Sequence, residues 1–143
     1  MEIRAYRPSD EAAVVSLWEE CGLTRPWNDP PKDIARKLLV QPELFLVGTL
    51  DGRLIATVMA GYEGHRGWVN YLAVAPHSRG RGCGRALMER VEQLLMNLGC
   101  PKVNIQVRSS NAEALGFYRA IGYAQEEIIS LGTRLIRDDG TAT

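Results

Sequence analysis

The chain has 143 residues, of which 45% are hydrophobic and 24% charged, and its 17 basic side chains balance 17 acidic ones. Such a chain fits one globular domain, and its zero net charge disfavours a nucleic-acid binder. It contains no apolar run of the ~20 residues that a membrane span needs, and the N-terminus lacks a signal-peptide core. The three cysteines without CxxC spacing favour reduced thiols over a metal site. We therefore expect a cytoplasmic protein with no metal, nucleic-acid or membrane partner.

Apolar periodicity predicts the elements of the N-terminal part. Residues 2–7 form a short strand, and Ser9 caps the helix that follows. The apolar positions of this helix keep the i, i+3, i+4, i+7 spacing: Val14, Leu17, Trp18 and Cys21. A loop at 23–31 contains Asn28 and Asp29, either of which can cap a second helix over 33–39.

The rest of the chain alternates between strands and helices. Three antiparallel strands are predicted at 44–50, 53–62 and 68–75, and Asp51-Gly52 forms a hairpin turn between the first two. The helix after residue 82 has one apolar face: Leu87, Val91, Leu94, Leu95 and Leu98. The remaining elements are a strand at 102–108, a helix at 111–121, a strand at 127–135 and a frayed polar tail at 136–143. The plan is that of a single α+β domain over residues 1–143.

The stretch RGRGCGR at residues 79–85 stands directly between a predicted strand and a predicted helix. Backbone N–H groups at a helix N-terminus attract anions, and glycines let the backbone approach an anion without a Cβ in the way. Arginine adds forked donors that suit phosphate. The pattern indicates a pyrophosphate cradle, although a plain glycine-rich turn with solvated arginines explains the loop alone equally well.

Two nucleotide-binding motifs do not fit this loop. A P-loop needs GxxxxGK[ST], and neither Lys nor Ser or Thr follows Gly84. A Rossmann fingerprint needs a third glycine after Gly82 and Gly84, and the strand at 102–108 carries no carboxylate for a ribose. The sequence thus disfavours a nucleotide-binding domain.

Two motifs together resemble the GNAT superfamily of N-acetyltransferases. Arg79-x-x-Gly82-x-Gly84, after a strand ending LAVAP, resembles the [Q/R]-x-x-G-x-[G/A] acyl-CoA loop of that family. The stretch NAEALGFYRAIGY at 111–123 is similar to its second signature, NxxAxxFYxxxGF. The segment RPWNDP further resembles a subgroup of stand-alone bacterial members. The resemblance implies a three-layer α/β fold, with a mixed, mostly antiparallel sheet of six to seven strands and about four helices.

The resemblance also implies roles for particular residues. Acetyl-CoA is the expected cosubstrate, and an amine attacks its thioester directly. A backbone N–H near Leu72 would polarise the thioester carbonyl, and Tyr118 would protonate the departing thiolate. The implied donor-binding residues are Leu72, Ala73, Val74, Arg79, Gly80, Arg81, Gly82, Cys83, Gly84, Arg85, Asn111, Phe117 and Tyr118. Core packing of Tyr118 and helix capping by Asn111 are the plainer interpretations of those two residues.

The proton acceptor and the acceptor-binding residues stay open. Many relatives use a glutamate on the strand before the loop, but WVNYLAV contains no carboxylate and no histidine. The candidates for the base are Glu63 and His65 in the preceding turn, with Asn70 as a residue that could orient a water.

For the acceptor, the loop between the first two helices offers a group of three residues: Trp27, Asn28 and Asp29. An indole beside a carboxylate could hold a cationic amine, while Trp27 as a cover of the core edge and Asp29 as a cap explain the same residues.

The sequence supports two functions. The first is an N-acetyltransferase acting on a primary amine of a small molecule or peptide. The second is a non-catalytic acyl-CoA-binding or regulatory module. The absence of a carboxylate from the strand WVNYLAV favours this second function. Tyr118 favours the first, because a binding module needs no proton donor beside sulfur. Only a few residues separate Tyr123 from the last predicted strand. A short final hairpin of this kind is compatible with an open acceptor cleft or with a homodimer.

Overall fold

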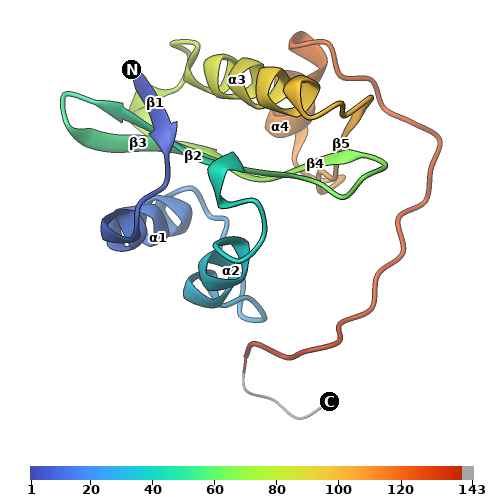
Figure 1. Ribbon diagram of the computed structural model, residues 1–143, viewed down its shortest axis with the longest axis horizontal. Helices are drawn as coiled ribbons and strands as arrows, with labels where there is room; N and C mark the ends of the chain where they lie inside the picture. Colours follow the sequence, from blue (N-terminus) through green and yellow to red (C-terminus); the bar gives the residue numbers. More distant parts are fainter. Residues whose placement is uncertain (140–143) are drawn as a thin grey trace.

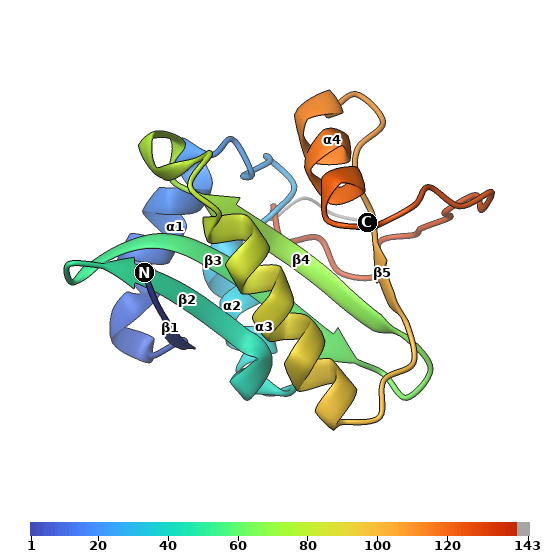
Figure 2. The same ribbon diagram turned by 90° about the horizontal axis from the view of Figure 1, so that it is seen from above.

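A computed structural model describes residues 1–139, which form one five-stranded sheet with helices on both faces (Figures 1 and 2). The strands are β1 (Glu2–Ala5), β2 (Phe45–Leu50), β3 (Arg53–Tyr62), β4 (Gly67–Val74) and β5 (Val103–Ile105). The helices are α1 (Glu11–Glu20), α2 (Pro30–Lys37), α3 (Cys83–Asn97) and α4 (Ala112–Ala120). In Figure 1, α1 and α2 lie below the sheet, and α3 and α4 lie above it. The predicted layers and the predicted number of helices are therefore confirmed.

The strands lie in the sheet in their sequence order, β1 to β5. The first four pair antiparallel with their neighbours, whereas β5 pairs parallel with β4. The predicted β2–β3 hairpin is confirmed, and both of its turn residues have positive φ, 51° at Asp51 and 77° at Gly52. The parallel pair arises because α3 carries the chain back across the sheet before β5 begins.

A buried polar link lies at the centre of the lower face of the sheet. The side chains of Trp18 on α1 and Thr57 on β3 have no solvent exposure. The indole Nε1 of Trp18 donates to Thr57 Oγ1 at 2.9 Å, and Thr57 Oγ1 donates to the backbone carbonyl of Tyr71 at 2.9 Å. The Trp18 ring also stacks on the Tyr71 ring, with centroids 3.8 Å apart. These contacts fix α1 against β3 and β4.

The helix starts differ in part from the prediction. Ser9 does not cap α1, because residues 8–10 form a 3-10 turn in which the Asp10 carboxylate accepts from the backbone N–H of Arg7 at 2.8 Å. Of the two caps left open for the second helix, Asp29 is used, and its Oδ1 accepts from Lys32 N at 3.1 Å. Asn and Asp are equally good caps by residue type, so the sequence alone left this choice open.

The expectation of six to seven strands is wrong, since the sheet has five. The predicted strand at 102–108 is reduced to Val103–Ile105, and residues 127–135 form no strand. The latter segment runs away from the sheet edge toward α2 as an extended chain (Figure 1). Its alternating apolar pattern is suited to a strand, but a strand also needs a partner edge, and β5 is too short to provide one.

Side chains hold the extended segment at three points along its length. Glu126 pairs with Lys102, and Ser130 accepts from Gln106, both beside β5. Farther on, Asp138 forms a bidentate pair with Arg36 of α2, with both N–O distances at 2.7 Å. The prediction of a frayed tail covers 136–143, of which residues 140–143 lie outside the described residues.

We predict that Thr57→Val destabilises the fold by about 2–4 kcal/mol, because it leaves the Trp18 indole and the Tyr71 carbonyl buried without their hydrogen bonds. Urea denaturation measures the change. Thr49→Val is the matched control, since Thr49 on β2 is partly exposed, and a change within about 0.5 kcal/mol is expected there. Equal effects of the two substitutions would contradict the role given to Thr57.

Candidate functional site

The C-terminal half of β4 has no strand on its outer side. β4 pairs with β5 only through Gly67–Val69, opposite Val103–Ile105, although β4 continues to Val74. On its other side β4 pairs with β3 as far as Val74. Backbone groups of residues 70–74 that point away from β3 therefore face a gap between diverging strands. An extended ligand with amide groups could pair with such an edge.

The pairing of β4 with β3 contains a β-bulge, just after the point at which β4 stops pairing with β5. Thr57 pairs with Ala73 and Met59 with Asn70, so Tyr71 and Leu72 together stand opposite Val58. Tyr71 has φ of 52°, a left-handed conformation that is rare for an aromatic residue. Bulges and such strained residues are found next to active sites, where they redirect backbone groups. The expected thioester-polarising N–H near Leu72 falls at this bulge.

The predicted cradle at residues 79–85 lies at the end of β4 and forms the start of α3. Gly80 and Gly82 have φ of 75° and 82°, and a Cβ at either would meet no atom within 4 Å. Gly82 caps α3 without a side-chain hydrogen bond, and the first turn contains no acidic residue. The N–H groups at the start of α3 are thus open to an anion.

The arginines of the loop differ in their roles. Arg79 Nε donates to the carbonyl of Val74 at 3.0 Å, and its guanidinium lies 3.9 Å from the Glu113 carboxylate. Arg85 donates to the carbonyl of Ala120 at 3.4 Å. Arg81 is exposed. Arg79 and Arg85 therefore connect the loop to β4 and α4 while adding positive charge around the glycines.

Helix α4 packs directly against the start of α3. A Cβ at Gly84 would lie 3.0 Å from Phe117 Cζ, so the two helices are in close contact here and a side chain at Gly84 would require the Phe117 ring to shift. Tyr118 follows, with its ring centroid 5.1 Å from that of Phe117 and 5.9 Å from that of Tyr123. Asn111 caps α4, since its Oδ1 accepts from Ala114 N at 3.1 Å. The second motif thus sits beside the cradle.

Tyr118 differs from the neighbouring Tyr123 in the hydrogen bonding of its hydroxyl. Burial raises the pKa of Tyr118 to about 12, so the phenol is protonated at neutral pH. Within the part of the chain that the structure describes, nothing hydrogen-bonds to its hydroxyl, whereas the Tyr123 hydroxyl donates to Glu92 at 2.8 Å. Tyr118 lines the same cavity as Asn70 of β4, so it offers a free proton donor beside that strand.

Glu63 and His65 lie in the β3–β4 turn, at the end of β4 opposite the cradle. The Glu63 carboxylate accepts from the backbone N–H groups of His65 and Arg66, and these bonds lower its pKa. A base needs the opposite shift. Asn70, by contrast, is exposed on β4 directly before the bulge. The structure thus brings Asn70 to the gap and keeps Glu63 and His65 away from it.

The three predicted acceptor residues lie in the loop between α1 and α2. The guanidinium of Arg108 lies over the Trp27 ring, 5.8 Å from its centroid. Asp29 caps α2, and the backbone N–H of Asn28 donates to the carbonyl of Arg25 at 2.9 Å. Trp27 and Arg108 connect this loop to the chain after β5, so in this structure the indole face is occupied by an arginine of the protein itself.

Sequence reasoning missed Tyr71 at the bulge and Asp33 on α2. The Tyr71 hydroxyl donates to Asp33 Oδ2 at 2.7 Å, across from β4 to α2. In the sequence, Tyr71 stands in a regular run of strand residues, and Asp33 looks like an ordinary acidic residue in the first turn of a helix. Only a register slip between β3 and β4 turns Tyr71 toward α2, and no local pattern announces such a slip.

Comparison with known proteins places this geometry in a family. The model of the acetyltransferase (GNAT) family matches residues 12–123. The chain belongs to the GNAT acetyltransferase family. Acetyltransferase YE1169 of Yersinia enterocolitica is 51% identical, and acetyltransferase ECA0875 of Pectobacterium atrosepticum is 49% identical. Each alignment spans 138 residues, 96% of this chain and 98% of the relative.

A solved structure shares the fold of this acetyltransferase. Aminoglycoside N-acetyltransferase AAC(6')-Iy in complex with CoA has a TM-score of 0.73 and 18% identity, over 93% of this chain and 99% of that one. Among the described residues of this acetyltransferase, no helix is long and apolar enough to cross a membrane. Nor does the described part contain a group of three or more His, Cys, Asp or Glu residues placed to bind a metal.

We predict that Gly84→Ala destabilises this GNAT domain by about 1–3 kcal/mol, because the new methyl group must displace the Phe117 ring. Gly116→Ala on α4 is the matched control. A Cβ there meets nothing within 4 Å, so alanine should stabilise the helix by about 0.5–1 kcal/mol. Chemical denaturation measures both changes, and equal signs would contradict the packing described for α3 and α4.

Proposed function

We propose that the protein is an acetyl-CoA-dependent N-acetyltransferase that acts in the cytoplasm on a primary amine of a small molecule or peptide. The observation that carries the proposal is the early end of β4–β5 pairing, directly beside a glycine-rich helix start. This arrangement offers an open strand edge for an amide-containing arm and an anion site at one end of it. Acetyl-CoA has both features in one molecule.

The donor fits the residues at hand. Backbone groups of Leu72, Ala73 and Val74 would pair with the amides of the pantetheine arm along the open edge. The open glycine backbone and the N–H groups of α3 would hold the pyrophosphate, with charge from the surrounding arginines. Support for this fit comes from the missing cap and missing acidic residue at the start of α3, since a filled cap would compete with phosphate.

The chemistry then needs two groups at the bulge. The lone pair of the neutral amine attacks the thioester carbonyl carbon, and the N–H near Leu72 stabilises the negative charge on the oxygen. When the C–S bond breaks, the attacking nitrogen gives one proton to solvent and the Tyr118 hydroxyl gives its proton to the thiolate; the Tyr118 phenolate then takes up a proton from solvent. Its raised pKa keeps Tyr118 protonated at neutral pH, as this role requires.

A non-catalytic acyl-CoA-binding module is the second candidate, favoured by the absence of a carboxylate on β4. Such a module would use the same open edge and the same cradle. It would gain nothing from an unpartnered phenol at the gap, and the Tyr118 hydroxyl is the observation that favours catalysis. Binding and turnover experiments separate the two candidates.

For the donor site, we predict that wild-type protein binds acetyl-CoA and neither ATP nor NAD in calorimetric titrations. Gly82→Val should weaken acetyl-CoA binding by about 100-fold or more, because the side chain fills the cradle and disfavours the positive φ. Gly64→Val is the control. Gly64 also has positive φ, 102°, with open space around it, but it lies in the β3–β4 turn. Equal loss in both variants would argue against the cradle.

For the acid, we predict that Tyr118→Phe lowers kcat by about 100-fold while acetyl-CoA binding is unchanged. Release of free CoA thiol in the presence of ethylamine measures turnover. Tyr123→Phe is the control, because its hydroxyl is already bonded to Glu92. Because the Tyr118 pKa is about 12, the wild-type rate should show no loss from this group below about pH 10. Full activity of Tyr118→Phe would exclude the assigned role.

A further inference from the structure

The C-terminal segment, residues 126–138, exposes large apolar side chains close together. Five of them lie within nine residues: Ile128, Ile129, Leu131, Leu135 and Ile136. Their exposed fractions range from 64% to 90%. Isolated apolar residues are common on protein surfaces, whereas a continuous apolar patch marks a surface that contacts another molecule. The segment is therefore a candidate interaction surface.

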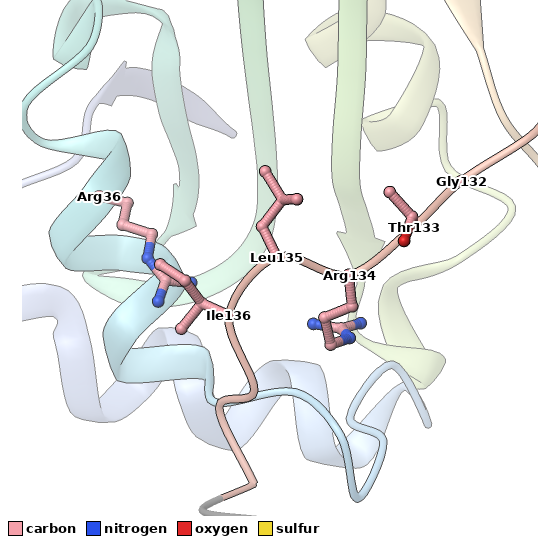
Figure 3. A pocket seen from close by; sticks show the side chains of 6 residues that line it. All are labelled: Arg36, Gly132, Thr133, Arg134, Leu135 and Ile136. Atoms are coloured by element: carbon pink, nitrogen blue, oxygen red, sulfur yellow. The ribbon is translucent and has the colours of Figure 1, made fainter. Parts of the chain in front are cut away.

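The side chains of the segment alternate between its two sides, as they do in a strand. Two residues at even positions, Ser130 and Asp138, bond to other parts of the same chain. The three most exposed apolar residues are all at odd positions: Ile129 at 87%, Leu131 at 90% and Leu135 at 85%. Figure 3 shows the open pocket between Arg36 and residues 132–136, where Leu135 and Arg134 point to opposite sides of the chain. The even side thus holds the segment to its own domain, and the odd side is left as an apolar stripe in solvent.

The backbone of the segment is unpaired as well. Among the residues that the structure describes, none of 127–136 shares a hydrogen bond with another backbone group. An extended chain with unpaired N–H and C=O groups can pair edge to edge with another extended chain. The segment therefore has both properties of a β-strand that lacks its neighbour, an apolar stripe and an open backbone edge.

The sequence of the segment complements itself when two copies run in opposite directions. Counted outward from Gly132, the opposed residues are Leu131 with Thr133, Ser130 with Arg134, Ile129 with Leu135, Ile128 with Ile136 and Glu127 with Arg137. The outer three pairs are apolar or oppositely charged, and such cross-strand pairs stabilise antiparallel strands. A two-fold axis through the centre repeats every pair, and an interface of this kind closes at two copies.

We propose that the C-terminal segments of two copies of this chain pair as antiparallel strands, centred on Gly132, and join the copies as a homodimer. Two paired strands alone are only marginally stable. Here the bonds of Ser130 and Asp138 hold each segment extended in advance, which lowers the entropy that pairing costs. A different protein as partner would use the open backbone, but it would not account for the matched order of the outer residues.

The paired stretch adjoins the cavity beside β4. Ile128 and Leu131 line the same cavity as Asn70 and Tyr118. The segment of the second copy pairs along this stretch, so it lies beside that cavity. Pairing therefore covers the apolar stripe and also adds residues of a second copy next to the candidate site.

Sedimentation equilibrium of wild-type protein should show a homodimer, and Leu135→Asp should raise its dissociation constant by about 100-fold or more. The new carboxylate would have to lose water beside Ile129 of the second copy. Leu39→Asp is the matched control, because Leu39 is also 85% exposed but follows α2. It should change the dissociation constant by less than about threefold, as expected for a surface substitution outside the interface. Circular dichroism shows whether both variants are folded.

A cysteine at the centre of the segment tests the register. Opposed residues of an antiparallel pair have Cα atoms about 4.5–5.5 Å apart, within reach of a disulfide. A Cβ at Gly132 meets nothing within 4 Å and its φ is not left-handed, so Gly132→Cys fits the backbone. Mild oxidation should link its two copies covalently. Ile128→Cys is the control, because its two sulfur atoms would be about 26 Å apart along the pair, and wild-type protein measures any linkage through the three native cysteines.

Loss of the homodimer in Leu135→Asp but not in Leu39→Asp, together with a disulfide in Gly132→Cys but not in Ile128→Cys, supports the proposal. Wild-type protein that stays monomeric overturns it. So does a homodimer that Leu135→Asp leaves intact, or one that the two aspartate variants weaken equally. A homodimer in which Gly132→Cys forms no disulfide overturns the antiparallel pairing centred on that residue.

Discussion

The pairing of β4 with β5 ends after three residues, and the arrangement of the site depends on this early end. β4 continues for five more residues along β3, so its outer edge is open from Asn70 to Val74. Hydrogen-bonding groups on an open edge are costly unless water or a ligand satisfies them. The cradle follows directly at the end of this edge. One interruption of the sheet thus leaves both an open strand edge and a cavity that Tyr118 of α4 lines.

The interruption would not be stable without support from below. The bulge holds Tyr71 in a left-handed conformation that costs on the order of 1–3 kcal/mol. Three contacts offset this cost: the stacking on Trp18, the bond from Thr57 to the Tyr71 carbonyl and the bond to Asp33. The buried core therefore fixes the strand edge in its diverging form, and the site is a consequence of packing on the opposite face.

The helical layers on the two faces of the sheet have different roles in the proposed site. The upper layer, α3 and α4, contributes the helix N-terminus and Tyr118, which serve the donor. The lower layer supports the bulge from the other face, through the stacking of Trp18 of α1 on Tyr71 and the bond from Tyr71 to Asp33 of α2. The C-terminal segment crosses from the upper layer to the lower one and is fastened at Arg36.

The sequence by itself determined the elements with strong local signals. The glycine-arginine loop, the Asp51-Gly52 hairpin and the amphipathic helices depend on residues close in sequence, so they could be predicted along with the family.

The tertiary structure alone decided the features that depend on contacts between distant parts of the chain. Residues 127–135 have the pattern of a strand, but the short β5 gives them no edge. Glu63 and Asp29 have the chemistry of site residues, but turn and helix N–H groups engage them. The meeting of Tyr71 with Asp33 requires a register slip between two strands. Such a register shift depends on packing across the whole sheet, so it cannot be predicted from residues that are close in sequence.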